Sequence, residues 1–150
     1  MNELKKAYCA GGCFWGIEES FRTKPGIIST EVGYAGGKDE NVNYEKVCKG
    51  NTGHAETVKI EFDEKIISYE KILKIFFQIH DPTTLNSQGT DFGTQYRSEI
   101  FYLNDNQRLV AERVLRDFDD RMSGKVVTKI SLLKNYCPAE EYHQKYLEKR

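Results

Sequence analysis

Hydrophobic and polar residues alternate in several short segments of the chain, which predicts β-strands. The pattern is clearest over residues 55–62, where Val58, Ile60 and Phe62 share one face and charged residues occupy the other. Such an alternation is typical of a strand with one face in the core. Similar patterns of apolar and β-branched residues predict the other strands at residues 4–10, 26–34, 98–103 and 125–133.

Apolar residues recur at steps of three and four in the segments between these strands, which predicts helices. The strongest case is the run from Tyr69 to Ile79, which follows Ser68, a favourable N-cap residue, and ends near His80. The other predicted helices begin at Cys13, at Asn104 or Asp105, and at Ala139, and the last two end near Met122 and Leu147.

The order of these elements predicts an α+β fold. We expect residues 1–150 to form one domain, a two-layer sandwich in which helices cover a mixed or antiparallel sheet with a ferredoxin-like β-α-β-β-α-β core. Two long polar loops, at residues 36–53 and 81–95, flank the predicted sheet. Because loops on a rigid sheet commonly carry functional residues, we expect the site there.

Composition and charge narrow the choice of partners. A chain of 150 residues that is 39% hydrophobic suits one globular domain, and its formal net charge of −1 argues against nucleic acid or an anionic membrane as a partner. The N-terminus lacks the apolar stretch of a signal peptide, so we expect a cytoplasmic protein whose four cysteines are reduced. Cys9 and Cys13 stand without a second close pair, so we expect no structural metal.

The segment Gly12-Cys13-Phe14-Trp15-Gly16 places a cysteine beside the only tryptophan of the chain, where a strand changes to a helix. Unpaired N–H groups at a helix N-terminus favour an anion, so this position predicts a Cys13 pKa below the ordinary value of about 8.5. The alternative is that Cys13 is a small buried core residue. The flanking glycines favour a nucleophile to which a substrate has access.

Three further residue types suit acid–base chemistry near this thiol. Glu56 has the same strand parity as Val58, which predicts an inward carboxyl whose pKa is raised by burial, although a solvent-facing position is the alternative. Asp91 could orient a neighbour. Tyr44 and Tyr96 could donate phenol hydrogen bonds, or only satisfy backbone carbonyls.

Other functions remain open on these residues alone. The chain holds three histidines, His54, His80 and His143, and any of them could pair with Cys13 in a Cys–His hydrolase. The aromatic residues could instead form a groove that binds peptides without catalysis. A redox dithiol of Cys9 and Cys13 is not favoured, because four residues of strand rise separate them by about 13 Å.

Several motifs occur together in one order along the chain. They are Gly12-Cys13-Phe14-Trp15-Gly16, Gly33-Tyr34-Ala35-Gly36-Gly37, Tyr44-Glu45-Lys46-Val47-Cys48, Gly53-His54-Ala55-Glu56, His80-Asp81-Pro82 and Gly93-Thr94-Gln95-Tyr96-Arg97-Ser98. With these motifs the chain resembles the peptide methionine sulfoxide reductases of the A type, over nearly its whole length.

The resemblance implies a site and a reaction without metal or organic cofactor. Cys13 would attack the sulfur of the S epimer of methionine sulfoxide, free or in oxidised proteins and peptides, and become a sulfenic acid. The aromatic residues Phe14 and Trp15 would enclose the substrate methyl group. The residues implied to hold and protonate the oxygen are Glu56, Tyr44 and Tyr96, with Asp91 in the same site.

The recycling step is less closely defined by the resemblance. Many members resolve the sulfenic acid with cysteines in a glycine-rich C-terminal tail, which does not follow residue 147 here. Cys137 or Cys48 could resolve it, with Cys9 a further alternative. We expect instead that thioredoxin, glutaredoxin with glutathione, or a small dithiol reduces Cys13 directly, and that the protein is a monomer.

Overall fold

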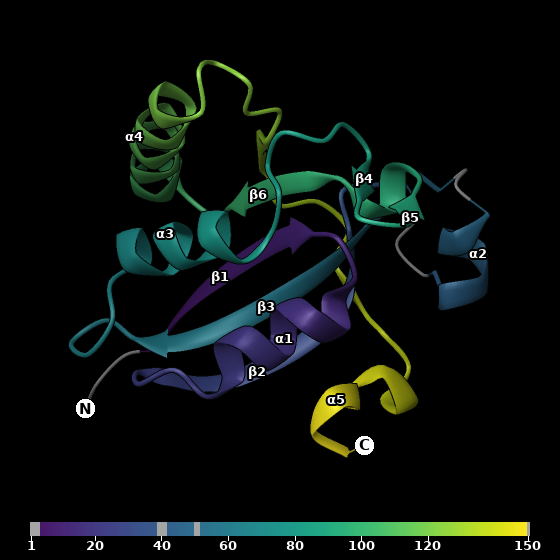
Figure 1. The fold of residues 1–150 in the computed structure, drawn as a ribbon. Helices are drawn as coiled ribbons and strands as arrows, with labels where there is room; N and C mark the ends of the chain where they lie inside the picture. The colour runs from purple at the N-terminus through teal and green to yellow at the C-terminus, as the bar shows by residue number, and fades with distance from the viewer. Residues whose placement is uncertain (1–3, 39–41, 50–51, 150) are drawn as a thin grey trace.

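A six-stranded sheet organises the protein (Figure 1), in the strand order β7-β6-β1-β3-β2-β8. The computed structural model describes residues 4–38, 42–49 and 52–149. Neighbouring strands are antiparallel except β6 and β7, which are parallel. The strands are β1 (Leu4–Gly11), β2 (Ile27–Ala35), β3 (Ala55–Asp63), β6 (Ser98–Tyr102), β7 (Lys129–Leu132) and β8 (Cys137–Pro138).

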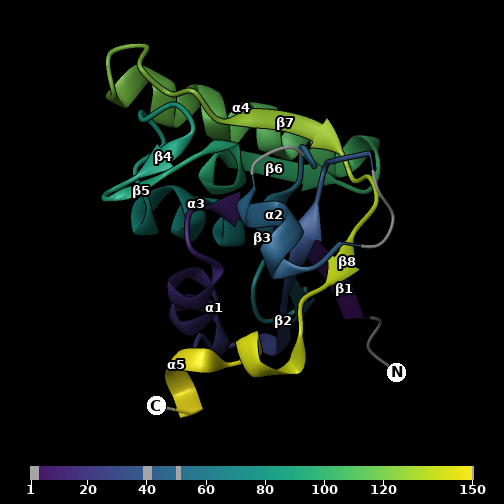
Figure 2. The ribbon, with the colours of Figure 1, turned by 90° about the vertical axis from the view of Figure 1, so that its right-hand side faces the viewer.

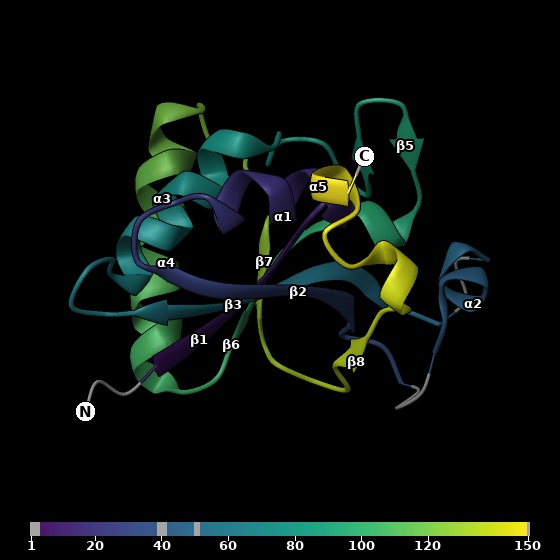
Figure 3. The same ribbon diagram turned by 90° about the horizontal axis from the view of Figure 1, so that it is seen from below.

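The four central strands confirm the predicted ferredoxin-like core. Helix α1 (Phe14–Arg22) connects β1 to β2, and helix α3 (Tyr69–Ile79) lies between β3 and β6 in the chain. Both helices cover one face of the sheet, and α4 (Asp105–Arg121) packs beside α3 (Figures 1 and 3). Apolar side chains such as Phe21, Ile60 and Phe76 are fully buried between these layers, as their spacing predicts.

The opposite face of the sheet is covered in part by the chain between β7 and β8 (Figure 3). Tyr136 from this connection packs edge-on against Tyr8 at 5.1 Å between ring centroids, and its hydroxyl donates to Glu31 at 2.8 Å. These contacts hold the connection on the sheet, and with it the edge strand β8.

The predicted helix caps are confirmed. The Ser68 side chain accepts a hydrogen bond from the Lys71 N–H at 3.0 Å, and the Asn104 side chain accepts from the Gln107 N–H at 2.9 Å. Each cap satisfies an N–H group that has no partner within its own helix.

The C-terminal segment differs from the prediction. Residues 139–147 do not form one helix; a 3₁₀ turn, η2 (Glu141–His143), and a short helix, α5 (Tyr146–Lys149), replace it. Gln144 pairs through its side-chain amide with the N–H and C=O of Val32, each at 2.8 Å, and Lys145 has a φ of 50°. These contacts to β2 outweigh the local helical pattern. The last predicted strand is also shorter, because only residues 129–132 pair with β6.

The two long loops contain short elements. Helix α2 (Tyr44–Cys48) lies in the first loop, of which residues 39–41 and 50–51 are outside the described residues. The second loop contains the hairpin strands β4 (Ser87–Gln88) and β5 (Asp91–Phe92) and the turn η1 (Thr94–Tyr96). Both loops and the C-terminal segment surround the same end of the sheet, which faces the viewer in Figure 2. Within the described ranges, no helix is long and apolar enough to cross a membrane.

Candidate active site

Cys13 lies at this end of the sheet as the N-cap of α1, and Gly12 alone separates it from β1. The turn of the backbone that leads from β1 to Cys13 depends on Gly12, which has a φ of 101°. A Cβ at position 12 would lie 2.7 Å from Cγ of Gln88, so a side chain there would clash with the second loop. The turn therefore delivers a partly exposed thiol to the start of the helix, as predicted.

Glu56 approaches this thiol from the start of β3. Its side chain faces inward, in agreement with the strand parity, and the residue is 2% exposed. Oε1 accepts a hydrogen bond from the Phe14 N–H at 3.2 Å, while Oε2 is buried without a hydrogen-bond partner. The site thus contains one carboxyl oxygen with no hydrogen-bond partner among the residues that the structure describes.

Burial also sets the protonation state of Glu56. Desolvation raises its pKa to about 8, although the Phe14 N–H lowers it, and the charge of Asp91 raises it further. The carboxyl is therefore protonated at neutral pH and can donate a proton from Oε2.

The prediction of a lowered pKa for Cys13 is wrong for the unliganded protein. Burial raises the pKa of this thiol to about 11, and the charges of Glu56 and Asp91 act in the same direction. The backbone N–H groups of Trp15 and Gly16 at the helix start do lower it, as expected, but by less. Desolvation of the thiolate outweighs the helix N-terminus here.

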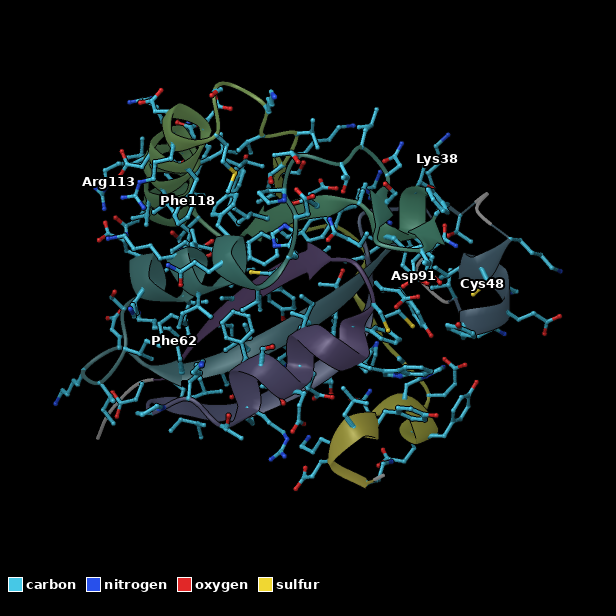
Figure 4. The ribbon with its side chains drawn as sticks, in the orientation of Figure 1. Lys38, Cys48, Phe62, Asp91, Arg113 and Phe118 are labelled. Carbon is cyan, nitrogen blue, oxygen red and sulfur yellow. The ribbon has the colours of Figure 1, made fainter. Side chains whose placement is uncertain are left out.

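The two predicted tyrosines and Asp91 belong to the same electrostatic cluster. Burial raises the pKa of Tyr96 to about 12, with further contributions from the charges of Glu56, Asp91 and Cys13 among others. A hydrogen bond with the Cys48 side chain is the largest cause of a raised Tyr44 pKa. Both phenols are therefore neutral donors. Figure 4 shows Asp91 on the hairpin, near the short helix that carries Cys48.

The partly exposed Trp15 forms an aromatic wall beside Cys13. Its indole N–H donates to Nδ1 of His143 at 3.1 Å, and its ring stacks on Tyr146 with centroids 3.9 Å apart. The His143 ring also contacts the rings of Tyr44 at 4.6 Å and Phe14 at 5.3 Å. The C-terminal segment thus fixes the orientation of Trp15 and connects it to α2.

Glu140 anchors this C-terminal segment. Its carboxylate accepts hydrogen bonds from the hydroxyls of Tyr34 at 3.1 Å and Tyr142 at 3.0 Å, and from the backbone N–H of Tyr44 at 3.2 Å. Burial alone would raise the Glu140 pKa, but a hydrogen bond from its own backbone N–H, together with these three hydrogen bonds, holds it below its ordinary value. The anion therefore connects β2, α2 and η2 around the site.

The sequence pattern indicates His143 only as a possible catalytic base and predicts no role for Glu140 or Tyr146. The sequence signal for these residues is the cluster of acidic, aromatic and histidine residues in Glu140-Glu141-Tyr142-His143, followed by Tyr146. A predicted helix over this segment obscured it, because a helix would distribute these side chains around several faces.

The ring nitrogens of His80 and Nδ1 of His54 bond groups other than Cys13, and Nδ1 of His143 bonds the Trp15 indole. The His80 ring nitrogens bond Phe76 O at 2.6 Å and Ser98 Oγ at 2.7 Å, and burial lowers the His80 pKa to about 4. Nδ1 of His54 accepts from the Gly37 N–H at 3.2 Å. The ionisable groups that act on the Cys13 pKa are Glu56 and Asp91. In the part of the chain that the structure describes, no group of three His, Cys, Asp or Glu side chains is arranged to hold a metal ion.

The other cysteines differ in their access to the site. Cys9 is fully buried in the middle of β1, and burial raises its pKa to about 12. Cys137 is half-buried on the edge strand β8, with its Sγ 3.5 Å from the carbonyl oxygen of Val42. Cys48 is exposed at the end of α2, beside Tyr44.

Comparison with known proteins gives a consistent result. Residues 5–150 match the model of the family described as peptide methionine sulfoxide reductase. The chain is 68% identical over 139 residues to peptide methionine sulfoxide reductase MsrA of Pelagibacter ubique, which covers 93% of this chain and 95% of that protein. Two solved structures of Mxr1 from Saccharomyces cerevisiae are also similar. The reduced form has a TM-score of 0.95 at 38% identity, covering 99% of this chain and 86% of that one. The complex with Trx2 has a TM-score of 0.69 at 26% identity, covering 96% and 85%.

Proposed function

The chain belongs to the peptide methionine sulfoxide reductase family, and we propose that its Cys13 reduces the S epimer of methionine sulfoxide, free or within oxidised proteins and peptides. The observation that carries this proposal is the protonated Glu56 carboxyl, which lies in the same electrostatic cluster as Cys13 and whose buried Oε2 has no hydrogen-bond partner within the described part of the chain. A sulfoxide oxygen is an acceptor that such a group can protonate.

The proposed first step transfers oxygen from the substrate to the enzyme. The Cys13 sulfur attacks the sulfoxide sulfur while Glu56 protonates the oxygen, and the thiol proton of Cys13 restores the Glu56 carboxyl. This attack forms an S–S bond. The S–O bond of the substrate then breaks, and the oxygen adds as hydroxide to the Cys13 sulfur, which breaks the S–S bond and leaves its electron pair on the substrate sulfur. The substrate sulfur is thereby reduced by two electrons to a thioether, and Cys13 is oxidised by two electrons to a sulfenic acid. One thiol and one sulfoxide thus become one sulfenic acid and one thioether, so the atoms balance.

The proposed binding mode distinguishes the two epimers. Glu56, Tyr44 and Tyr96 hold the oxygen, and the rings of Phe14 and Trp15 hold the methyl group. With the sulfur facing Cys13, the R epimer would exchange the positions of oxygen and methyl. It would place an apolar group against buried donors and leave them without a partner, which is strongly unfavourable.

The direct test of the function uses the unmodified protein with each epimer of free methionine sulfoxide and dithiothreitol. We expect methionine from the S epimer only, with continued turnover that depends on the reductant. A Cys–His hydrolase would need no reductant, and a peptide-binding groove would form no product. Equal turnover of both epimers, or none of either, would refute the proposal.

We propose that an external thiol reduces the sulfenic acid on Cys13, which is partly exposed. The thiol attacks the sulfenic sulfur, water leaves and a mixed disulfide forms; a second thiol then releases Cys13 as a thiol. Thioredoxin is the reductant that we favour, because the related Mxr1 structure was solved in complex with Trx2. Glutaredoxin with glutathione, or a small dithiol, would follow the same chemistry.

The proposed reaction needs residues of one chain only, so we propose that the protein acts as a monomer. We propose the cytoplasm as its compartment.

This proposal predicts the oxidation state after one turnover without reductant. Mass spectrometry is expected to find a sulfenic acid on Cys13, trapped with dimedone, while Cys48 and Cys137 remain free thiols. Cys9 is excluded as a partner by its position in the middle of the sheet. Cys48 is the internal alternative, because it is exposed and its charge acts on Tyr96. A Cys13–Cys48 disulfide that disappears in Cys48→Ser and persists in Cys137→Ser would contradict direct external reduction.

A further inference from the structure

Arg97 connects two loops of the site without belonging to the proposed reaction. It lies between η1 and β6, and its side chain is only 13% exposed. Nε donates to Glu99 Oε1 at 2.7 Å, Nη1 donates to the carbonyl of Thr94 at 2.9 Å, and Nη2 donates to the carbonyl of Gly53 at 2.9 Å. One planar guanidinium therefore bonds a carboxylate and two backbone carbonyls from different segments.

Each of these carbonyls precedes a residue of the site by a few positions. Gly53 lies three residues before Glu56, at the point where the first loop enters β3. Thr94 begins the turn η1, which ends at Tyr96. The guanidinium thus joins the backbone that carries the carboxyl to the backbone that carries the phenol.

The surroundings of Arg97 fit a fixed side chain. Glu99, whose side chain is 6% exposed, balances its charge. A Cβ on Gly36 would lie 2.8 Å from Nη2, and Gly36 has a φ of 94°, so the backbone there makes room for the guanidinium. On its outer side Arg97 lines an open cavity of about 560 Å³ with Glu99 and Lys129, and this cavity contains none of the proposed catalytic residues.

We propose that Arg97 is a positioning residue that sets the separation of the Glu56 carboxyl and the Tyr96 hydroxyl. This inference rests on the proposed function. Lysine cannot replace it, because a single ammonium group lacks the fork that spans two carbonyls and a carboxylate. Arg97 acts on the oxygen-binding groups through the backbone and does not touch the substrate.

The expected consequence is a loss in the chemical step rather than in substrate binding. A displacement of about 1 Å in a catalytic group can reduce a rate by about 10²-fold. We expect kcat for free S-methionine sulfoxide to fall by roughly 10- to 100-fold in Arg97→Met, with KM changed much less. We expect Arg97→Lys to recover only a small part of this loss.

The pH profile separates positioning from a general loss of folded protein. Release of Gly53 would admit water to the Glu56 carboxyl and move its pKa toward the ordinary value, so the alkaline decline of kcat/KM should shift to lower pH. The groups that face Glu56 and would contribute to this profile are Cys13 on α1, Tyr34 on β2, Tyr44 on α2, Asp91 on β5 and Tyr96 on η1.

The experiment measures kcat, KM and the pH profile for the unmodified protein, Arg97→Lys and Arg97→Met. Each kcat is calculated per active enzyme molecule, and the methionine formed in a single turnover gives the number of active molecules. Arg113→Met is the control, because Arg113 lies on α4, where it pairs with Glu70 of α3, far from the site in Figure 4. If Arg97→Met does not fold, Glu99→Gln is the second variant. In this variant Arg97 can keep its hydrogen bonds to the Thr94 and Gly53 carbonyls, so we expect it to keep the pH profile and most of kcat.

An unchanged kcat in Arg97→Met would overturn the inference. So would a loss in kcat with an unshifted pH profile in Arg97→Lys, because this pattern indicates a structural role only. Failure of the unmodified protein to form methionine would instead refute the proposed function, so the two failures are distinguishable.

Discussion

Cys13→Ser abolishes the reduction of methionine sulfoxide. Serine keeps the size and the polar character of the side chain at the start of α1, but its hydroxyl cannot accept oxygen in a reversible two-electron step as sulfur does. We expect no methionine above background, with either free S-methionine sulfoxide or an oxidised peptide as substrate, measured by chromatography in the presence of dithiothreitol.

The matched control for this variant is Cys137→Ser, and Cys9→Ser serves as a second comparison. Cys137 lies on the edge strand with its Sγ near the Val42 carbonyl, a contact that a serine hydroxyl can also make. We expect Cys137→Ser to retain its activity, whereas Cys9→Ser tests the core, since it places a hydroxyl in a fully buried position. Retained turnover in Cys13→Ser would exclude Cys13 as the nucleophile.

Glu56→Gln lowers kcat by about 10²- to 10⁴-fold, because oxygen leaves the substrate sulfur readily only when it is protonated. Glutamine keeps the carbonyl oxygen that can accept from the Phe14 N–H, but it cannot supply a proton from the second position. An unchanged kcat in this variant would mean that another group, such as Tyr44 or Tyr96, protonates the oxygen.

The same carboxyl predicts the pH dependence of the unmodified enzyme. The competent form holds the proton on Glu56, whose pKa is about 8, so kcat/KM should be level below that pH and fall above it. Glu56→Gln should lack this decline. A tenfold rise in kcat/KM of the unmodified enzyme between about pH 7 and pH 9 would instead indicate that formation of the Cys13 thiolate limits the rate.

Stability measurements provide the control for folding. Because burial raises the Glu56 pKa from 4.5 to about 8, the protein loses stability as the pH rises between these values: the unfolded chain releases the proton earlier. Each pKa unit corresponds to about 1.4 kcal/mol. Urea unfolding should therefore show that Glu56→Gln gains stability relative to the unmodified protein between about pH 5 and pH 8.5.

The patterns of strand and helix residues in the sequence predicted most of the fold. Alternation in β3 placed Glu56 on the same face as Val58, and the structure confirms that the carboxyl is buried. The helix caps at Ser68 and Asn104 could be predicted from the sequence because each cap bonds a backbone N–H only three residues away. Interactions within one turn or one strand are encoded locally, and a single sequence is sufficient to read them.

The C-terminal segment could not be read in this way. Gln144 bonds Val32, and Lys145 donates its backbone N–H to Glu18 at 2.7 Å, over separations of more than 100 residues. The sequence motifs include Cys13, Glu56, Tyr44 and Tyr96, and Asp91 lies two residues before the last motif. The hydrogen bond from Trp15 to His143, in contrast, depends on where the C-terminal segment returns to the sheet.

The pKa of Cys13 shows the same division between local and long-range effects. Its position at a helix start follows from residues 11–16 and correctly indicates N–H groups that favour the thiolate. Its burial acts in the opposite direction and has the largest effect on the pKa, and the carboxyl groups of Glu56 and Asp91, brought beside it from β3 and the β4–β5 hairpin, also raise the pKa. Local chain geometry is specified by neighbouring residues, whereas desolvation and charge depend on every segment that folds against the thiol.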